Sequence, residues 1–177
     1  DFLSDFLHSL GVILHFRKEP GLGKMLILKP TWATNAVYKV LDHTKEYAIN
    51  PGRFSKKNLD EIWKSDEYAD VFEELLVLME KFELCYELPQ NPGNYIVPQL
   101  LPQDQPAYDW SEPIKLQVRY TYTFLPKGIV TRLIVRLHED IQDQGTVWKR
   151  GAVFSYQGSK AEVIERYRDK EIQIRAT

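Results

Sequence analysis

The sequence predicts an α+β protein built from two bodies, and three observations support that class. Residues 1–98 mix helical periodicity with short apolar runs, which favours a helical subdomain carrying small β-elements. Residues 114–177 open with a strict alternation of apolar and polar side chains, which favours a mainly antiparallel β-sheet subdomain with one packed helix. Residues 99–113 are rich in proline and form the linker between them.

Composition and charge exclude several classes of protein. At 177 residues, 44% hydrophobic and 27% charged, the chain has an ordinary soluble globular composition. A net charge of −2 provides no attraction to nucleic acid or to an acidic membrane. No apolar run approaches the roughly 20 residues that span a bilayer. Cys85 is the single cysteine and lies among apolar residues, which predicts a buried thiol and a cytoplasmic location.

Both ends of the sequence read as interior segments. Asp1–Asp5 resembles the middle of a helix and lacks the basic start and apolar core of a signal peptide. Glu171–Thr177 reads as a strand. We therefore expect a module of a longer polypeptide.

The first body is expected to open with a helix, a hairpin and a second helix. Apolar residues recur at helical spacing up to Gly11, which suits a helix C-terminus because glycine adopts the left-handed conformation there. Val12–Phe16 and Met25–Leu28 are apolar runs joined by a turn-rich loop, which predicts paired strands. Pro30 suits the first turn of the next helix, expected to end near Asp42.

Two further helices follow a polar linker, His43–Asn50. Ser55 suits the N-cap of a short helix that runs through Trp63. Asp66–Phe82 carries the longest apolar stripe at helical spacing and is expected to be the most regular helix.

A hairpin then completes a winged-helix-like unit in residues 1–98. Cys85–Leu88 and Tyr95–Val97 flank Pro89–Asn94, a turn with two prolines and a glycine. That shape raises DNA binding as one alternative and another protein-interaction role as a second. Between Asp66 and Glu83, however, seven carboxylates face a single lysine, so this helix would repel phosphates.

The second body begins with the clearest strand pattern in the chain. Ile114–Phe124 alternates strictly, which predicts one buried face and one polar face. Pro126 and Gly128 break the strand, and a helix over Ile129–Leu137 is expected to place Arg132 and Arg136 on the side opposite its apolar face.

Further strands complete the predicted sheet. Val147–Tyr156 is expected to form one strand with a bulge at Gly151. Ala161–Arg168 and Glu171–Arg175 flank a short polar turn, which predicts a hairpin.

No cluster of residues predicts catalytic, cofactor-binding or metal-ligating chemistry. Gly21–Lys24 lacks both the earlier glycine and the following Ser or Thr of a phosphate loop. The four histidines show no metal-binding spacing, and Cys85 has no base near it in sequence. The paired carboxylates are expected to be solvated surface charges.

Aromatic residues of the second body carry more information. They supply either the core of the sheet or a protein–protein interface, where such rings are enriched. The residues are Tyr120, Tyr122, Phe124, Trp148, Phe154 and Tyr156.

Six stretches in order resemble a COR domain, the "C-terminal of Roc" module of Roco proteins. They are LGVILHF, ILKPTWATNAVYKVLD, LLVLMEKFELCYEL, YIVPQLLP, RYTYTFLPKGIVTRLIVRLH and VWKRGAVF. The resemblance covers about residues 3–156 and implies winged-helix-like and dimerising halves. It also implies a preceding Roc GTPase domain and a C-terminal helix, neither of which this sequence includes.

What the resemblance implies is a non-catalytic regulatory module. It would pack on the Roc GTPase domain, form a homodimer through its C-terminal half, and couple the GTP or GDP state to dimerisation. GTP, GDP and Mg²⁺ would belong to the GTPase domain, with no cofactor in this chain. Neither nucleic acid nor membrane insertion is implied.

The resemblance also assigns residues by motif. The expected GTPase-domain contacts are Tyr120, Tyr122, Phe124, Leu125 and Pro126. The expected dimer contacts are Trp148, Phe154 and Tyr156. First-half motif positions that are either contacts or plain core are His15, Phe16 and Trp32.

Overall fold

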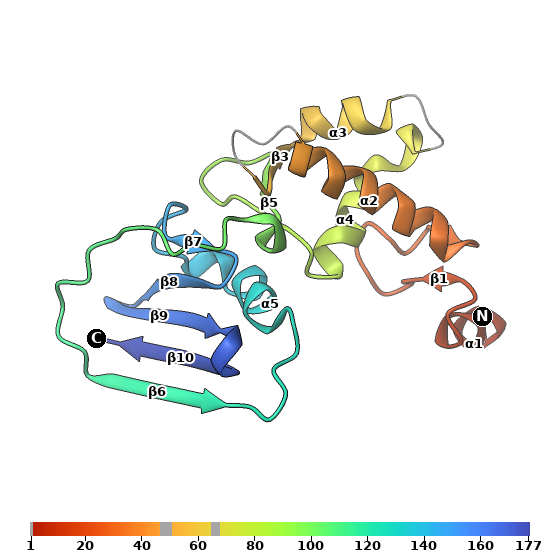
Figure 1. The fold of residues 1–177 in the computed structure, drawn as a ribbon. Coiled ribbons are helices and arrows are strands. Elements are labelled where there is room, and N and C mark those ends of the chain that lie inside the picture. The colour runs from red at the N-terminus through yellow and green to blue at the C-terminus, as the bar shows by residue number, and fades with distance from the viewer. Residues whose placement is uncertain (1, 47–50, 65–67) are drawn as a thin grey trace.

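The structure is a computed structural model that describes residues 2–46, 51–64 and 68–177. The predicted α+β class is confirmed, with three antiparallel sheets and five α-helices in the described part of the chain. Figure 1 shows the helices of the first body at the upper right and the five-stranded sheet of the second body at the lower left.

The first elements match the prediction in kind and are shorter. Helix α1 (Phe2–Ser9) closes where Gly11 takes a φ of 70°. The amide of Val12 donates to the carbonyl of Leu7 at 3.0 Å, as in a Schellman closure. Strands β1 (Leu14–His15) and β2 (Leu26–Ile27) pair antiparallel, as expected.

Helix α2 (Pro30–Glu46) begins at the predicted proline and runs past the predicted end. The polar linker expected from His43 is therefore wrong for residues 43–46, and its remainder lies outside the described residues. Thr44 explains the extension, because its side chain is buried and its hydroxyl donates to the carbonyl of Val40 at 3.0 Å. This polar residue continues the buried face of the helix.

Strand β3 (Arg53–Ser55) was not predicted, whereas helix α3 (Lys56–Trp63) was. Ser55 caps α3 through a capping box with Asn58, as its position suggested. A three-residue strand shows too little alternation to be seen in sequence. It is held by long-range pairing and by the Phe54 ring, which stacks on Tyr95 at 5.2 Å.

The predicted helix Asp66–Phe82 is too long. Helix α4 spans Phe72–Lys81 and is preceded by a 3₁₀ turn, η1 (Ala69–Val71), while residues 65–67 lie outside the described residues. The hairpin after it is confirmed as β4 (Tyr86–Glu87) paired with β5 (Asn94–Ile96). The three-stranded order is β3-β5-β4, and the winged-helix comparison stays a prediction.

The second body is one antiparallel sheet with strand order β6-β10-β9-β8-β7. Its strands are β6 (Leu116–Thr121), β7 (Val147–Trp148), β8 (Gly151–Tyr156), β9 (Ser159–Arg166) and β10 (Glu171–Ala176). Helix α5 (Ile129–Arg136) packs on β8 and β9, and the β9–β10 hairpin is confirmed. The 3₁₀ turns are η2 (Pro98–Leu100), η3 (His138–Asp140) and η4 (Tyr167–Asp169).

The single strand predicted over Val147–Tyr156 is wrong, because the chain reverses at Lys149 and Arg150 to make β7 and β8 a hairpin. Gly151 is therefore not a bulge. A Cβ atom there would collide with the Trp148 ring and with the carbonyl oxygen of Val163. Glycine is needed for this close approach.

The two bodies share buried surface. Tyr86, Ile96 and Leu101 pack in the same apolar cluster as Val130 and Ile134 of α5. Arg132 and Arg136 of α5 are exposed, and both lie near a carboxylate of the first body. Arg136 pairs with Glu83 of the first body at 2.6 Å, and Arg132 Nε lies 3.8 Å from the same carboxylate. Helix α5 thus holds the bodies together.

Candidate functional site

Strand β6 is the edge of the sheet, and its predicted buried face is wrong. Leu116 is 54% exposed and Tyr120 is 52% exposed, although they lie on the apolar side of the alternation. The strand also ends at Thr121, before Phe124. An alternating pattern therefore predicted the strand correctly and its burial incorrectly.

The pairing register explains why this face is exposed. Tyr120 pairs with Ile172, so the two side chains share one face of the sheet. That face is covered by α5 over β8 and β9, and Ile172 is buried there. Figure 1 shows β6 at the far edge of the sheet, beyond α5, so the apolar face continues past the helix that covers it.

The chain after β6 presents one aromatic ring. Phe124 is 74% exposed, while the next side chain, Leu125, is buried in the core of the second body. Tyr122 is half-buried against the same core, and its amide donates to the carbonyl of Lys170 at 2.9 Å. Pro126 is exposed. Leu125 and Tyr122 hold the loop in place, and Phe124 projects from it.

We call this exposed apolar surface the open edge. Its exposed members are Ile114, Leu116, Tyr120 and Phe124, and the half-buried Val118 lies among them. Exposed apolar side chains gathered on an edge strand and on the segments that flank it mark an interaction surface. An unpaired edge of this kind also invites strand pairing.

The three predicted dimer contacts fall in two environments. Trp148 and Phe154 are buried within the chain, whereas Tyr156 is 62% exposed at the end of β8. Of the three, only Tyr156 therefore presents most of its side chain to a partner. The assignment of dimer contacts itself stays a prediction.

Sequence reasoning missed a buried carboxylate that fastens the linker to the sheet. Glu162 of β9 is 3% exposed and accepts a hydrogen bond from the hydroxyl of Tyr108 in the linker. Arg175 of β10 donates to it from Nη2 at 2.9 Å. Burial, together with the bond to Glu162, raises the pKa of Tyr108. No local spacing in the sequence marks this acid, because its linker partner Tyr108 is 54 positions away.

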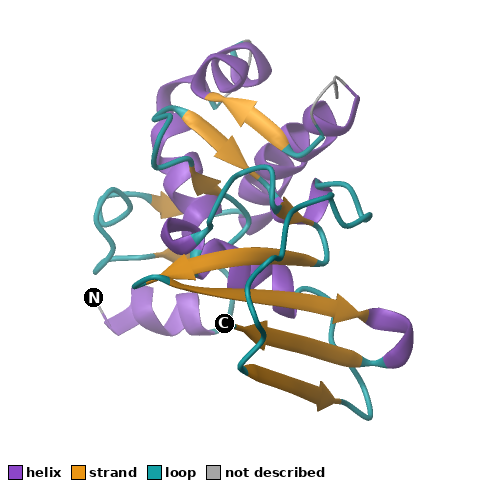
Figure 2. Ribbon diagram, turned by 90° about the vertical axis from the view of Figure 1, so that its left-hand side faces the viewer, coloured by secondary structure: helices purple, strands orange, loops and turns teal. Residues whose placement is uncertain are grey.

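The linker crosses the sheet on the face opposite α5 (Figure 2). The ring of Trp110 lies 4.4 Å below the Arg175 guanidinium, and Glu112 pairs with Lys160 at 3.1 Å. Residues 105–112 thus lie against the second body as a strap. A proline-rich composition predicted the boundary without predicting these contacts.

The first-half motif residues pack in or beside the core of the first body. Phe16 and Trp32 are partly buried against that core, and Trp32 lies 5.1 Å from the ring of Tyr68. His15 Nδ1 lies 2.6 Å from the hydroxyl of Ser4. These contacts give them structural roles.

The other candidate groups are placed in structural surroundings. Cys85 is fully buried, as predicted, and burial raises the pKa of its thiol. Leu22 of the Gly21–Lys24 turn is also buried, and the turn leads into β2 and not into a helix. Within the described ranges, no three His, Cys, Asp or Glu residues gather to hold a metal ion.

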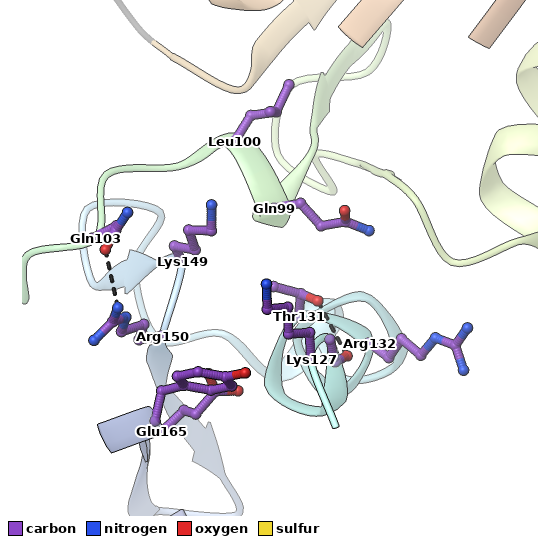
Figure 3. A pocket seen from close by; sticks show the side chains of 11 residues that line it. Gln99, Leu100, Gln103, Lys127, Thr131, Arg132, Lys149, Arg150 and Glu165 are labelled. Atoms are coloured by element: carbon purple, nitrogen blue, oxygen red, sulfur yellow. Dashed lines mark hydrogen bonds between the residues drawn. The ribbon is translucent and has the colours of Figure 1, made fainter. Parts of the chain in front are cut away.

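A groove lies where the linker meets α5 and the β7–β8 turn (Figure 3). Its volume is about 570 Å³. Gln99 and Leu100 of η2 form one wall, Lys127 and Thr131 at the start of α5 form a second, and Arg150 belongs to a third.

Comparison with known families divides the chain at the same place as the fold. Residues 1–101 match the family described as "C-terminal of Roc, COR-A domain". Residues 114–177 match "C-terminal of Roc, COR-B domain".

Curated relatives are much longer proteins. The chain is 31% identical over 165 residues to "Probable serine/threonine-protein kinase pats1" of Dictyostelium discoideum, covering 85% of this chain and 5% of the relative. It is 30% identical over 175 residues to a "Roc-COR-CHAT protease" of Runella zeae, covering 96% of this chain and 18% of the relative.

No helix among the described residues has the length and apolar character needed to cross a bilayer.

Proposed function

Because the chain belongs to the COR family of Roco proteins, with a COR-A and a COR-B part, we propose that it is a non-catalytic regulatory and dimerisation module. It packs on an adjacent Roc GTPase domain and couples the GTP or GDP state of that domain to dimerisation. GTP, GDP and Mg²⁺ bind to the GTPase domain. The module acts in the cytoplasm, which its single buried thiol supports.

The observation that carries the proposal is the open edge. A projecting aromatic ring beside exposed aliphatic side chains is the composition of an interface hot spot. Phe124 is 74% exposed on a loop that is anchored by the buried Leu125 and the half-buried Tyr122, so ordering the backbone of this loop costs little conformational entropy on binding. We assign this edge to the GTPase domain.

Coupling also needs a route from the open edge to the rest of the module. The loop that carries Phe124 leads directly into α5, and α5 contacts the first body through the ion pair between Arg136 and Glu83. A second contact joins Arg53 Nη2 to the carbonyl of Gln144 at 2.9 Å. Movement of the loop would therefore be transmitted to the junction of the two bodies.

The dimer surface is assigned to the C-terminal half. Tyr156 supports this assignment because its ring is exposed near the end of β8, while the neighbouring Phe154 is fixed in the core. Dimerisation that depends on nucleotide requires two arrangements of the module that bind the GTPase domain with different affinity.

Phe124→Ala tests the GTPase contact in a polypeptide that contains the GTPase domain. We expect GTP turnover and nucleotide-dependent mass in light scattering to change, because a hot-spot side chain contributes roughly 2 kcal/mol or more to binding. The free energy of unfolding of the 177-residue chain should shift by no more than about 0.5 kcal/mol, since the ring is exposed.

Phe2→Ala is the matched control, because Phe2 is 85% exposed on α1, far along the chain from the open edge. It should leave both GTP turnover and mass unchanged. Unchanged turnover and mass for Phe124→Ala as well would remove the proposed contact.

A further inference from the structure

The groove between the linker and the second body is lined mainly by positively charged side chains. Its cationic lining residues are Lys127, Arg132, Lys149 and Arg150. Of the described residues that line it, only Glu165 is acidic. The chain as a whole carries a net charge of −2, so positive charge is concentrated here against the sign of the molecule.

Among the described residues, carboxylates balance only part of this positive charge. Arg150 donates to the neutral side-chain oxygen of Gln103 at 3.0 Å. Arg132 shares Glu83 with Arg136, which holds that carboxylate at the shorter distance of 2.6 Å. Neither Lys127 nor Lys149 forms a salt bridge with any carboxylate in the described part of the chain.

A second hollow extends the groove along η4. Its volume is about 450 Å³, and it shares Gln103, Arg150, Glu165 and Tyr167 with the first. It adds Arg166 and Arg168, with Asp104 and Asp169 at its side. The two hollows therefore form one elongated trough in which cations outnumber carboxylates.

The placement of the cations indicates the shape of the ligand. Figure 3 shows Lys127 and Arg132 on the α5 side and Lys149 and Arg150 on the β7–β8 side, with charged ends that do not converge on one point. A compact anion would reach only part of this set. A chain with several carboxylates along its length would reach cations on both sides.

We propose that this trough binds an extended acidic segment of a partner protein, rich in Asp and Glu. Its carboxylates meet Lys127, Lys149 and Arg150. Because linker residues form one wall and α5 another, the bound segment holds the linker against the second body. The residues of the trough differ from those of the open edge, so the acidic-segment site and the GTPase contact can be tested independently.

The test is fluorescence anisotropy of a labelled peptide of Glu, Asp, Ser and Gly, titrated with the 177-residue chain. We expect binding that weakens as salt rises, and no binding of a peptide in which Gln and Asn replace the acids. The double variant K127E/K149E should bind at least about tenfold more weakly, because like charges then face the ligand.

Further variants test whether binding depends on the trough residues and not on the net charge or folding of the chain. K24E/K29E changes the net charge by the same amount on exposed lysines of the first body and should keep its affinity within about twofold. E165Q removes the acidic lining residue and should bind more tightly. The neutral pair K127Q/K149Q, with circular dichroism of each variant, separates lost binding from lost folding.

Three outcomes would overturn the proposal. One is an equal loss for the groove pair and the control pair, which would mean diffuse electrostatics. Another is displacement of the labelled peptide by inorganic tripolyphosphate at a lower concentration than by the unlabelled acidic peptide, which would mean a compact anion site. The third is duplex DNA that binds as tightly, with the same dependence on Lys127 and Lys149.

Discussion

Strands β7 and β6 are the two edges of one sheet, yet they meet different surroundings. At the β7 edge Trp148 is 2% exposed, its ring lies 6.0 Å from that of Tyr108 in the linker, and the amide of Lys149 donates to the carbonyl of Pro102 at 2.9 Å. At the β6 edge Tyr120 is half exposed. One edge is closed by the chain itself, whereas the other keeps its apolar side chains in solvent.

The difference separates residues that hold the fold from residues that are free to bind. Closed-edge aromatics are buried within the chain itself, and their substitution should act on stability first. Open-edge aromatics contribute little to stability and are available to a partner. Substitutions at the closed edge should therefore lower stability, whereas substitutions at the open edge should weaken binding and leave stability nearly unchanged.

The largest expected effect is at the closed edge. Trp148→Ala should lower the free energy of unfolding by about 3–5 kcal/mol, because a buried ring is removed and the cavity cannot fully collapse. Urea unfolding followed by fluorescence and by circular dichroism measures it. Phe124→Ala, at the open edge, is the control and should lower the free energy of unfolding by no more than about 0.5 kcal/mol. Similar losses at both edges would break the comparison.

A smaller effect is expected where the linker is fastened. Glu162→Gln should cost about 2–3 kcal/mol, because Arg175 then loses a charged partner beneath the linker. Limited proteolysis with chymotrypsin should also cut faster at Tyr108 and Trp110. Glu112→Gln breaks the more exposed pair with Lys160 and should cost less than about 1 kcal/mol. Unchanged cleavage for Glu162→Gln would mean that the strap is held by other contacts.

The smallest expected effect depends on pH. Burial raises the pKa of Glu165, and the nearby Arg150 and Lys149 oppose this only in part. The folded state then holds the proton more tightly than the unfolded chain, so stability falls as pH rises from the unfolded pKa through the folded pKa. Glu165→Gln should therefore stabilise the chain slightly at neutral pH and leave it unchanged at acid pH below both pKa values.

The control for this pH effect lies beside the open edge. Glu171 lies on β10 next to β6, with one oxygen 3.9 Å from Arg119, so Glu171→Gln should not stabilise the chain. Urea unfolding at neutral and acid pH compares the two variants. A gain for Glu165→Gln that is equal at both pH values would exclude burial of its charge as the cause.

Local sequence signals predicted the elements well where a single side chain decides the conformation. Gly11 ends α1, Pro30 begins α2 and Ser55 caps α3, since each satisfies a local backbone requirement. The resemblance of six sequence stretches to a COR domain is confirmed by the family matches.

Burial and long-range contacts were not predicted by the same signals. The alternation of β6 is identical whether a helix covers the apolar face or stops one strand short of it, and only the strand order decides. Trp148 and Tyr120 are both aromatic residues in predicted strands, and their local sequence does not show that Trp148 is buried and Tyr120 is exposed. The Glu162 cluster joins residues more than fifty positions apart, and no local spacing marks it.

The central claim is that the open edge is the surface that meets the GTPase domain. Hydrogen–deuterium exchange of the chain, with and without the separately prepared GTPase domain, tests it directly. We expect slower exchange across residues 114–126 and unchanged exchange across residues 147–156. Binding that leaves residues 114–126 unprotected, or that protects only the first body, would contradict the account.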